Sequence, residues 1–474
     1  MIRNSKKYLP YLFIFTALVS CASDPESQKS DKTAATIEFW LTNPDRSALF
    51  QKQNASQPTI IGGSVPVLEV FETQTFQSID GFGFALTGGS AILINQMDAA
   101  AKEALLKELF AVDGNNIGVS YLRISIGASD LSDRVFTYND LPYGQTDTTM
   151  TQFSLEPERK DLIPILKQIL AINPDIKILG SPWTAPVWMK TINSSIGGSL
   201  KPQYYSAYSK YFVKYIQEMK AEGIHIDAIT IQNEPLYGGN NPSMIMPAAE
   251  QASFIKNHLG PVFKTNNIET KIIIYDHNAD RTDYPITVLN DPEAKKYISG
   301  SAFHLYGGGI DDLLKVKTAH PDKDIYFTEQ WIGAPGNFPS DLNWHVKTLI
   351  IGGMRNWCRN VIEWNLASDP NQNPHTEGGC TQCLGAITIS GSLVSRNPAY
   401  YIIAHAAKFV RPGSKRIAST ISTTLPNVAF KTSDGKKVLI VLNDSKSTQI
   451  FKINTGNEPT TYSLLGGAVG TFVW

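Results

Sequence analysis

Short runs of β-branched and aromatic residues alternate with longer segments of helical period through the middle of the chain. In the longer segments, such as 98–110 and 204–222, apolar residues recur at steps of three and four, which is typical of amphipathic helices. Eight short runs have the composition of buried strands: 79–86, 119–126, 176–182, 228–233, 271–276, 299–306, 324–329 and 360–365. This alternation predicts an α/β fold in which eight parallel strands close into a (β/α)₈ TIM barrel.

The pattern changes on both sides of this block. Short runs separated by Gly, Asn, Asp and Pro are typical of antiparallel strands, and they occur at 60–71, 428–431, 438–443, 449–453 and 470–474. Asp434-Gly435 between two of these runs is a hairpin signal. Because neither flank is large enough to bury a core alone, we expect one β-sandwich built from both chain ends beside the barrel.

The first residues have the pattern of an export signal. Arg3, Lys6 and Lys7 precede an apolar run over 8–19 that is too short to span a bilayer. Leu18-Val19-Ser20-Cys21 is similar to a bacterial lipobox, in which cleavage leaves the cysteine as the lipidated first residue; an ordinary signal peptide is the alternative. We therefore expect an exported bacterial lipoprotein, held to a membrane through Cys21 at the periplasmic side or the cell surface.

These patterns predict five successive segments along the chain. They are a lipoprotein signal peptide at 1–21, a flexible tether at 22–35, the N-terminal part of the sandwich at 36–77, the catalytic barrel at 78–395 and the C-terminal part of the sandwich at 396–474. The tether is rich in Ser, Asp and Lys and has no apolar period, which is typical of a chain without a packed core.

Composition excludes several classes of function. The 474 residues carry a formal charge of −1 and are 42% hydrophobic, so no basic surface is expected to bind nucleic acid. Gly81-Phe82-Gly83 lacks the third glycine of a dinucleotide fingerprint, and Asp276 to Asp280 begins like a calcium loop but has Arg281 at the glycine position. We expect no cofactor and no metal, and no protein partner is evident.

Four cysteines are too few for a disulfide framework in a chain of this length. Cys380-Thr381-Gln382-Cys383 has the spacing of a redox or zinc half-site, but no second pair accompanies it. In an exported protein a local loop disulfide is the favoured interpretation, with Cys358 free or buried.

Two of the predicted barrel strands lead directly to a glutamate, Glu234 after the fourth run and Glu329 at the end of the seventh. The carboxyl ends of barrel strands carry the catalytic groups, and strands four and seven face each other across the mouth. Glycoside hydrolysis needs such a pair, one carboxylic acid for the leaving oxygen and one carboxylate on the other face of the sugar. The alternative is a simple turn in which Pro235 ends the strand and Glu234 faces solvent.

Several sequence blocks resemble glycoside hydrolase family 30, which contains glucosylceramidases and microbial endo-β-1,6-glucanases. Ser181-Pro182-Trp183-Thr184-Ala185-Pro186 resembles the third barrel strand of that family, and similar blocks occur at 77–83 and 121–127. Gln232-Asn233-Glu234-Pro235 is similar to the acid/base motif, and Phe327-Thr328-Glu329 to the nucleophile motif. The resemblance implies a retaining double displacement with Glu234 as acid/base and Glu329 as nucleophile.

The resemblance also implies a shell around the reacting sugar, formed by Arg123, Trp183, Asn233, His304, Tyr306 and Trp364. Arg123 could orient a carboxylate, Tyr306 could bind the nucleophile, and Asn233 could bind the sugar hydroxyl next to the reacting carbon. The two tryptophans offer flat faces to a sugar, with core filling as the alternative. For His304, a polar barrel residue with a satisfied hydrogen bond is favoured over a proton carrier.

The expected substrate is β-linked glucose, and the first expectation is an endo-β-1,6-glucanase. A surface lipoprotein meets glycans more readily than glycolipids, and Ile196-Gly197-Gly198-Ser199-Leu200 is similar to the bacterial glucanase branch. The alternatives are a glucosylceramidase or exo-β-glucosidase, a xylanase, and a non-catalytic glycan-binding lipoprotein. Linkage and chain length depend on the loops that follow the strands, at 193–202, 237–247, 331–344 and 369–383.

Overall fold

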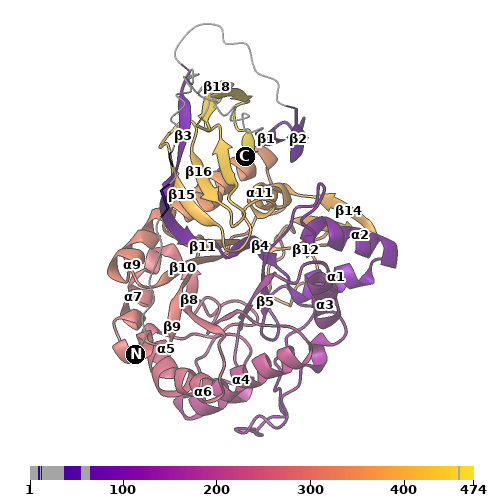
Figure 1. Ribbon diagram of the computed structural model, residues 1–474. Coiled ribbons are helices and arrows are strands. Elements are labelled where there is room, and N and C mark those ends of the chain that lie inside the picture. Colours follow the sequence, from indigo (N-terminus) through magenta and orange to yellow (C-terminus); the bar gives the residue numbers. More distant parts are fainter. Residues whose placement is uncertain (1–8, 11, 13–36, 55–64, 457–458) are drawn as a thin grey trace, which may run out of the picture. The chain divides into compact units, whose positions relative to one another are not determined.

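The computed structural model describes residues 9–10, 12, 37–54, 65–456 and 459–474 (Figure 1). The predicted cleavage and lipidation site at Cys21 and the predicted tether at 22–35 lie outside the described residues. Thr36–Trp474 forms one compact unit. Within the described ranges, no helix combines the length and the apolar character needed to traverse a bilayer.

Eight parallel strands close into a barrel, which confirms the predicted fold class. In order around the barrel they are β10 (Asp324–Glu329), β11 (Cys358–Asn365), β4 (Gly81–Ala85), β5 (Tyr121–Ser125), β6 (Lys177–Ser181), β7 (Ala228–Thr230), β8 (Lys271–Asn278) and β9 (Ile298–His304). Each of the eight predicted runs contains or overlaps one of them. A layer of side chains from seven of these strands is buried as a separate cluster: Tyr121, Leu179, Ala228, Ile273, Ala302, Tyr326 and Ile362.

Helices cover the outside of the barrel (Figure 1). The predicted helix at 98–110 is confirmed as α2 (Ala99–Phe110), because the Asp98 side chain accepts the Ala101 N–H and the apolar side buries Leu109 and Phe110. The predicted helix at 204–222 is confirmed as α4 (Tyr205–Ala221). The others are α1 (Gly88–Gln96), α3 (Leu162–Ile172), α5 (Ala248–Phe254), α6 (Gly260–Thr265), α7 (Asp283–Leu289), α8 (Pro292–Lys295), α9 (Leu313–Ala319) and α10 (Phe338–His345).

Both ends of the chain contribute to a second, nine-stranded sheet. Its order is β19 (Thr460–Leu464), β18 (Gln449–Asn454), β3 (Val67–Ser78), β15 (Lys415–Ser419), β16 (Asn427–Lys431), β17 (Lys437–Leu442), β20 (Val469–Val473), β1 (Glu38–Thr42) and β2 (Gln51–Gln53). This order confirms a sandwich built from both ends. Residues 60–64 of the predicted run at 60–71 lie outside the described residues.

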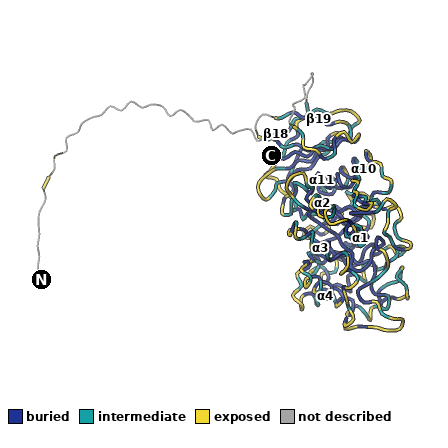
Figure 2. Tube along the Cα trace, turned by 90° about the vertical axis from the view of Figure 1, so that its right-hand side faces the viewer, coloured by how far each residue is buried: buried dark blue, intermediate teal, exposed yellow. Residues whose placement is uncertain are grey.

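The sheet curls, so that strands distant in its order pack face to face. The ring centroid of Phe472 of β20 lies 4.7 Å from that of Tyr462 of β19, a strand at the far end of the order. The opposite face of the sheet packs toward the barrel, where Phe430 contacts Phe82. Buried positions therefore run through the inner strands, with exposed positions on the outer loops (Figure 2).

Seven strands were not predicted: β1, β2, β15, β19, and β12 (Ala367–Ser368), β13 (Ile387–Ser390) and β14 (Leu393–Arg396), which form a small third sheet. Strand β1 has no polar side, because Phe39 enters the sandwich core and Trp40 packs toward the barrel. Strand β15 contains Arg416, whose guanidinium carbon lies 3.6 Å from the ring centroid of Phe76. Neither strand has the alternation of apolar and polar residues that predicts a strand.

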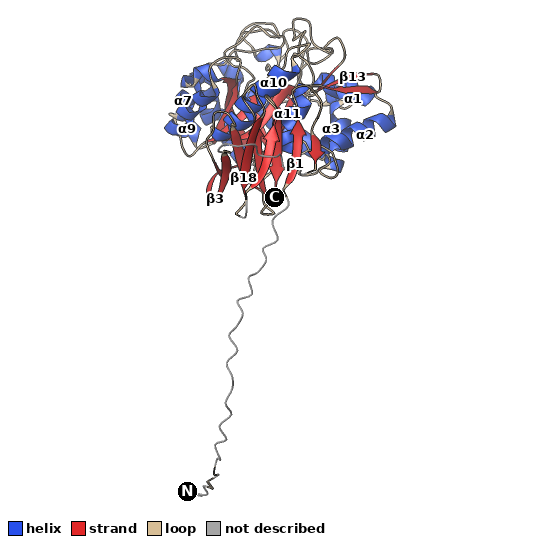
Figure 3. Cartoon of the chain, turned by 90° about the horizontal axis from the view of Figure 1, so that it is seen from above, coloured by secondary structure: helices blue, strands red, loops and turns tan. Residues whose placement is uncertain are grey.

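Helix α11 (Pro398–Ala407) is buried between the barrel and the sheet (Figure 1), and Figure 3 shows it from above. Its His405 bridges the two ends of the chain, because its ring nitrogens lie 2.8 Å from the hydroxyl oxygens of Thr42 and Thr471. Burial lowers the pKa of His405 to about 3. The folded protein therefore keeps this ring neutral over most of the acidic range.

We expect His405 to lower the free energy of unfolding as pH drops below about 6.5, the usual pKa of histidine. Below that pH the unfolded chain binds a proton on His405 that the folded protein excludes, so the contribution of this residue to stability rises with pH up to about 6.5. Between pH 7 and pH 5 the loss from this residue should be about 2 kcal/mol. Urea unfolding at both pH values measures it. The change in the free energy of unfolding between the two pH values should differ by about 2 kcal/mol between wild type and His405→Gln. His225→Gln, at a side chain 71% exposed, should match wild type.

Candidate active site

Five strand ends bring polar side chains to one mouth of the barrel. Arg123 belongs to β5, Glu234 follows β7, Asp276 belongs to β8, His304 ends β9 and Glu329 ends β10. All five are at most 9% exposed. The carboxyl end of a TIM barrel is where catalytic residues gather.

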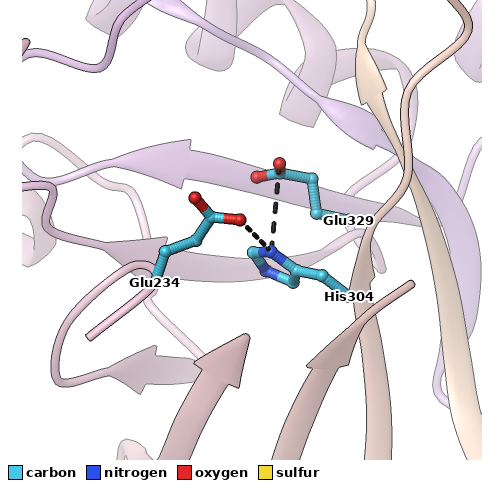
Figure 4. Close-up of side chains that lie close together, drawn as sticks. All are labelled: Glu234, His304 and Glu329. Carbon is cyan, nitrogen blue, oxygen red and sulfur yellow. Dashed lines mark hydrogen bonds and ion pairs between the residues drawn. The ribbon is translucent and has the colours of Figure 1, made fainter. Parts of the chain in front are cut away.

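The two glutamates approach each other beside His304 (Figure 4). One carboxylate oxygen of Glu234, one of Glu329 and one ring nitrogen of His304 lie within 4.8 Å of one another. The His304 Nδ1 is 3.2 Å from Glu234 Oε1 and 3.9 Å from Glu329 Oε1. Retaining glycosidases hold their carboxyls about 5 to 5.5 Å apart, and inverting ones about 6.5 to 9.5 Å. The arrangement is therefore that of a retaining pair.

Arg123 is the positive centre of the site and is fully buried. Its Nη1 donates to Glu329 Oε2 at 2.5 Å, and its Nη2 donates to Asn233 Oδ1 at 2.7 Å and to Asp276 Oδ2 at 2.8 Å. Charge-assisted hydrogen bonds of this kind stabilise the ionised form of a carboxyl. Burial raises the pKa of Glu329 above its usual value, and the charges of His304 and Arg123 oppose this rise. Arg123 therefore orients Glu329 and favours its ionised form against the effect of burial.

Asp276 is a member of this network that was not predicted. Tyr275 and Asp276 have φ angles of +75° and +66°, and the register with β9 shifts between Tyr275 and His277. This bulge turns the carboxylate of Asp276 toward Arg123 and toward the hydroxyls of Thr230 and Thr328, which donate at 2.7 Å. Burial alone would raise the pKa of Asp276, but the charge of Arg123 holds it far below its usual value.

The backbone at Glu234 is left-handed, with φ at +46°. Its N–H donates to the carbonyl oxygen of Asp276 at 2.9 Å, and the N–H of Asn233 donates to that of Pro182 at 2.8 Å. Such conformations cost about 1 to 3 kcal/mol and persist where neighbouring contacts enforce them. With 9% exposure, Glu234 does not face solvent, so the interpretation of this segment as a simple turn is wrong.

Three aromatic residues complete the predicted shell. The Tyr306 hydroxyl donates to Glu329 Oε1 at 2.9 Å, whereas Arg123 donates to the other oxygen, Oε2. The rings of Trp183 and Trp364 stack with centroids 5.5 Å apart, and the guanidinium carbon of Arg123 lies 4.8 Å from the Trp183 centroid. Both tryptophans are nearly buried, so they form part of the pocket wall and are partly covered by Arg123 and by each other.

A fourth carboxyl, Asp130, was also not predicted. It lies in an irregular segment after β5, and the sequence around it has no motif. Burial, and then the negative charges of Glu329 and Glu234, raise the pKa of Asp130 to about 7. The next residue, Leu131, packs in one cluster with Trp183 and Trp364, so Asp130 lies beside the pocket wall.

The proton distribution in the pocket is set by His304. Burial alone would lower the pKa of His304. The charge of Glu329 and the hydrogen bonds with Asp276 and Glu234 outweigh burial and raise this pKa to about 9. Burial raises the pKa of Glu234, but the hydrogen bond and charge of His304 bring it below its usual value. At neutral pH the hydrogen-bonded pair of His304 and Glu234 therefore holds one proton.

Glu234, His304 and Glu329 also have the spacing of a metal site. The guanidinium of Arg123, 2.5 Å from Glu329, already supplies a positive charge there. A divalent cation bound to the same carboxylate would be repelled by it, so these residues fit a metal poorly.

Comparisons with known proteins cover nearly the whole described chain. Residues 79–410 match the glycosyl hydrolase family 30 TIM-barrel domain, and residues 413–472 match the family 30 beta sandwich domain. An endo-1,6-beta-D-glucanase of Aspergillus fumigatus is 35% identical over 394 residues, which covers 77% of this chain and 78% of the relative. A putative glucosylceramidase of Caenorhabditis elegans is 29% identical over 400 residues, covering 79% and 76%. The solved structure of the endo-beta1,6-glucanase BT3312 superposes with a TM-score of 0.86 at 35% identity, covering 92% of this chain and 99% of that one.

Proposed function

Because the chain belongs to glycosyl hydrolase family 30 and is a retaining glycoside hydrolase, we propose that it acts on β-1,6-linked glucan as an endo-enzyme. The relatives named as endo-1,6-beta-glucanases support this substrate at 34 to 35% identity, whereas those named as glucosylceramidases are 26 to 30% identical. The observation that carries the reaction type is the convergence of Glu234 and Glu329 within 4.8 Å.

In the first step of the proposed mechanism, a carboxylate oxygen of Glu329 bonds to the anomeric carbon while the bond to the leaving sugar oxygen breaks. Arg123 and Tyr306 orient this carboxylate and favour its ionised form against the effect of burial. Glu234 gives its proton to the leaving oxygen. In the second step Glu234 takes a proton from water, whose oxygen displaces Glu329 and restores the free carboxylate.

We propose that His304 couples the two glutamates, in place of the passive role favoured from the sequence. The charge of Glu329 is the largest of the effects that raise the pKa of His304. As Glu329 becomes a neutral ester, that effect disappears and the pKa of His304 falls. The proton then moves along the 3.2 Å contact to Glu234, at the moment when the leaving oxygen requires it.

Asn233 and Asp130 offer polar groups for recognition of the sugar bound in the pocket. Asn233 uses its amide oxygen for Arg123, which leaves its NH₂ group to bind the hydroxyl next to the reacting carbon. The Asp130 carboxylate can accept hydrogen bonds from sugar hydroxyls. A carboxylate that accepts from a hydroxyl distinguishes a sugar carrying that group from one lacking it.

Hydrolysis of four substrates tests the proposed specificity: pustulan, laminarin, xylan and a glucosyl lipid. We expect β-1,6-linked oligosaccharides longer than glucose from pustulan, with the β-anomer formed first in an NMR time course. Glucose as the only early product would indicate an exo-β-glucosidase. Faster cleavage of the lipid would indicate a glucosylceramidase, and either result would overturn the proposal.

We also propose that the mature chain is anchored to a membrane through a lipid on Cys21. Support comes from Arg3, Lys6 and Lys7 before an apolar run and from the lipobox-like residues that end at Cys21. A single lipid chain binds membranes only marginally, so several acyl chains on the cysteine are expected. Detergent partitioning of the wild type and Cys21→Ala tests this, and equal partitioning would exclude the anchor.

A further inference from the structure

The loop after β11 is closed by a disulfide between Cys380 and Cys383, which confirms the local disulfide interpretation; Cys358 is free and buried. Cys383 is 3% exposed. It packs in one cluster with Leu131, Trp183 and Trp364, and Cys380 lies against the same cluster. The disulfide is therefore part of the wall of the catalytic pocket.

The same loop is pressed against Asp130. The N–H of Thr376 donates to the Asp130 carbonyl oxygen at 2.9 Å, and the backbone N–H of Cys380 lowers the pKa of the Asp130 carboxyl. At Gly379, any Cβ would lie 2.3 Å from that carbonyl oxygen, so only glycine permits the approach. Asp130 thus takes its position from a loop that is some 250 residues distant in sequence.

The four-residue loop closed by the disulfide is also joined to the segment that follows Glu329. Ala334 donates its N–H to the carbonyl oxygen of Gln382 at 2.8 Å, and Leu384 donates to that of Ile332 at 3.1 Å. On its other side the loop binds the segment that follows Glu234, because Asn241 Nδ2 donates to the carbonyl oxygen of Glu377 at 2.9 Å. One loop therefore contacts Asp130 and the segments that carry both glutamates.

We propose that the Cys380–Cys383 disulfide is a positioning element that sets the Asp130 carboxylate for sugar binding, which rests on the proposed role of the pocket in glucoside hydrolysis. A disulfide that closes so short a loop removes little entropy from the unfolded chain, so its effect is local. Without it, Cys380 and Cys383 can separate, and the Cys380 N–H no longer has a fixed place beside Asp130. The sugar then loses a hydrogen-bond acceptor, although the barrel stays folded.

A double-mutant cycle tests this on an aryl β-glucoside, which requires only the glycone pocket. Asp130→Asn should lower kcat/KM roughly 10- to 100-fold, the effect of weakening one hydrogen bond to a charged group. Cys380→Ala/Cys383→Ala should lower it by a smaller factor, mainly through KM. Combining all three changes should add almost nothing to the loss from Asp130→Asn, because the disulfide acts through that carboxylate.

The pH profile supplies a second readout. Losing the Cys380 N–H raises the pKa of Asp130, so the acidic limb of kcat/KM for the cysteine variant should move to higher pH. The shift should be absent when Asp130 is asparagine. Cys358→Ala removes a buried thiol elsewhere and is the control for loss of a cysteine.

Wild-type protein reduced with dithiothreitol covers the case in which the cysteine variant fails to fold. Dithiothreitol gives two electrons to the disulfide and is oxidised to its cyclic form, leaving two thiols. Reduction should lower the activity of wild type, but it should not lower the activity of Asp130→Asn any further. Losses that multiply independently, or an unchanged cysteine variant, would overturn the proposal. A wild type that cleaves no β-glucoside would instead reject the proposed function.

Discussion

Replacing Glu329 with glutamine is expected to lower kcat roughly 10⁴-fold or more, on activated and natural substrates alike. Glutamine keeps the size of the side chain but cannot form the glycosyl ester on which the double displacement depends. Initial rates on an aryl β-glucoside and on pustulan measure the loss, and thermal unfolding checks the fold.

Glu158→Gln is the matched control for the Glu329 variant. Glu158 is also a buried glutamate, but its partner is the hydroxyl of Tyr138, and it is not among the residues at the barrel mouth. Its replacement should leave kcat unchanged. In wild type, a 2-deoxy-2-fluoroglucoside should become attached to Glu329. Attachment elsewhere, or a Glu329 variant that keeps several per cent of the activity, would contradict its assignment as nucleophile.

Replacing Glu234 with glutamine is expected to cost roughly 10²- to 10⁴-fold with leaving groups that need a proton. The loss should be much smaller in the first step for activated leaving groups, such as dinitrophenolate, because these depart without protonation. Added azide should then raise the rate and yield a β-glucosyl azide, since it attacks the ester without needing a base.

An equal loss on both kinds of leaving group would contradict the acid/base role of Glu234. Unchanged rates in this variant and in the Glu329 variant would place catalysis at other residues. A wild type that binds glucan without hydrolysing it would instead favour the alternative of a glycan-binding protein.

The strands of the barrel were predictable because their apolar runs are local. The run at 324–329 coincides with β10, and its last residue is Glu329. The predicted run at 228–233 extends past the end of β7 at Thr230, because the backbone leaves the sheet to place Glu234 in its left-handed conformation. Strand-end carboxylates were the signal that found the glutamates.

That same signal was present for Asp276, at the end of the predicted run at 271–276, and it was not used. Its role depends on a bulge that no local pattern indicates. Asp130 had no local signal, because its place in the pocket comes from contacts with Thr376, Gly379 and Cys380 far along the chain. Long-range contacts of this kind are what the sequence pattern does not contain.

The register of the large sheet pairs Glu38 of β1 with Val473 of β20. A ribosome that has released β1 and its neighbour β2 must still synthesise the entire barrel before β20, the partner on the other side of β1, exists. That side of β1 stays unpaired while hundreds of residues emerge, and pairing of such distant segments makes folding slow. Closure of this sheet is consequently a late step in folding. A chain truncated before β20 would leave β1 as an exposed edge strand that is prone to aggregation.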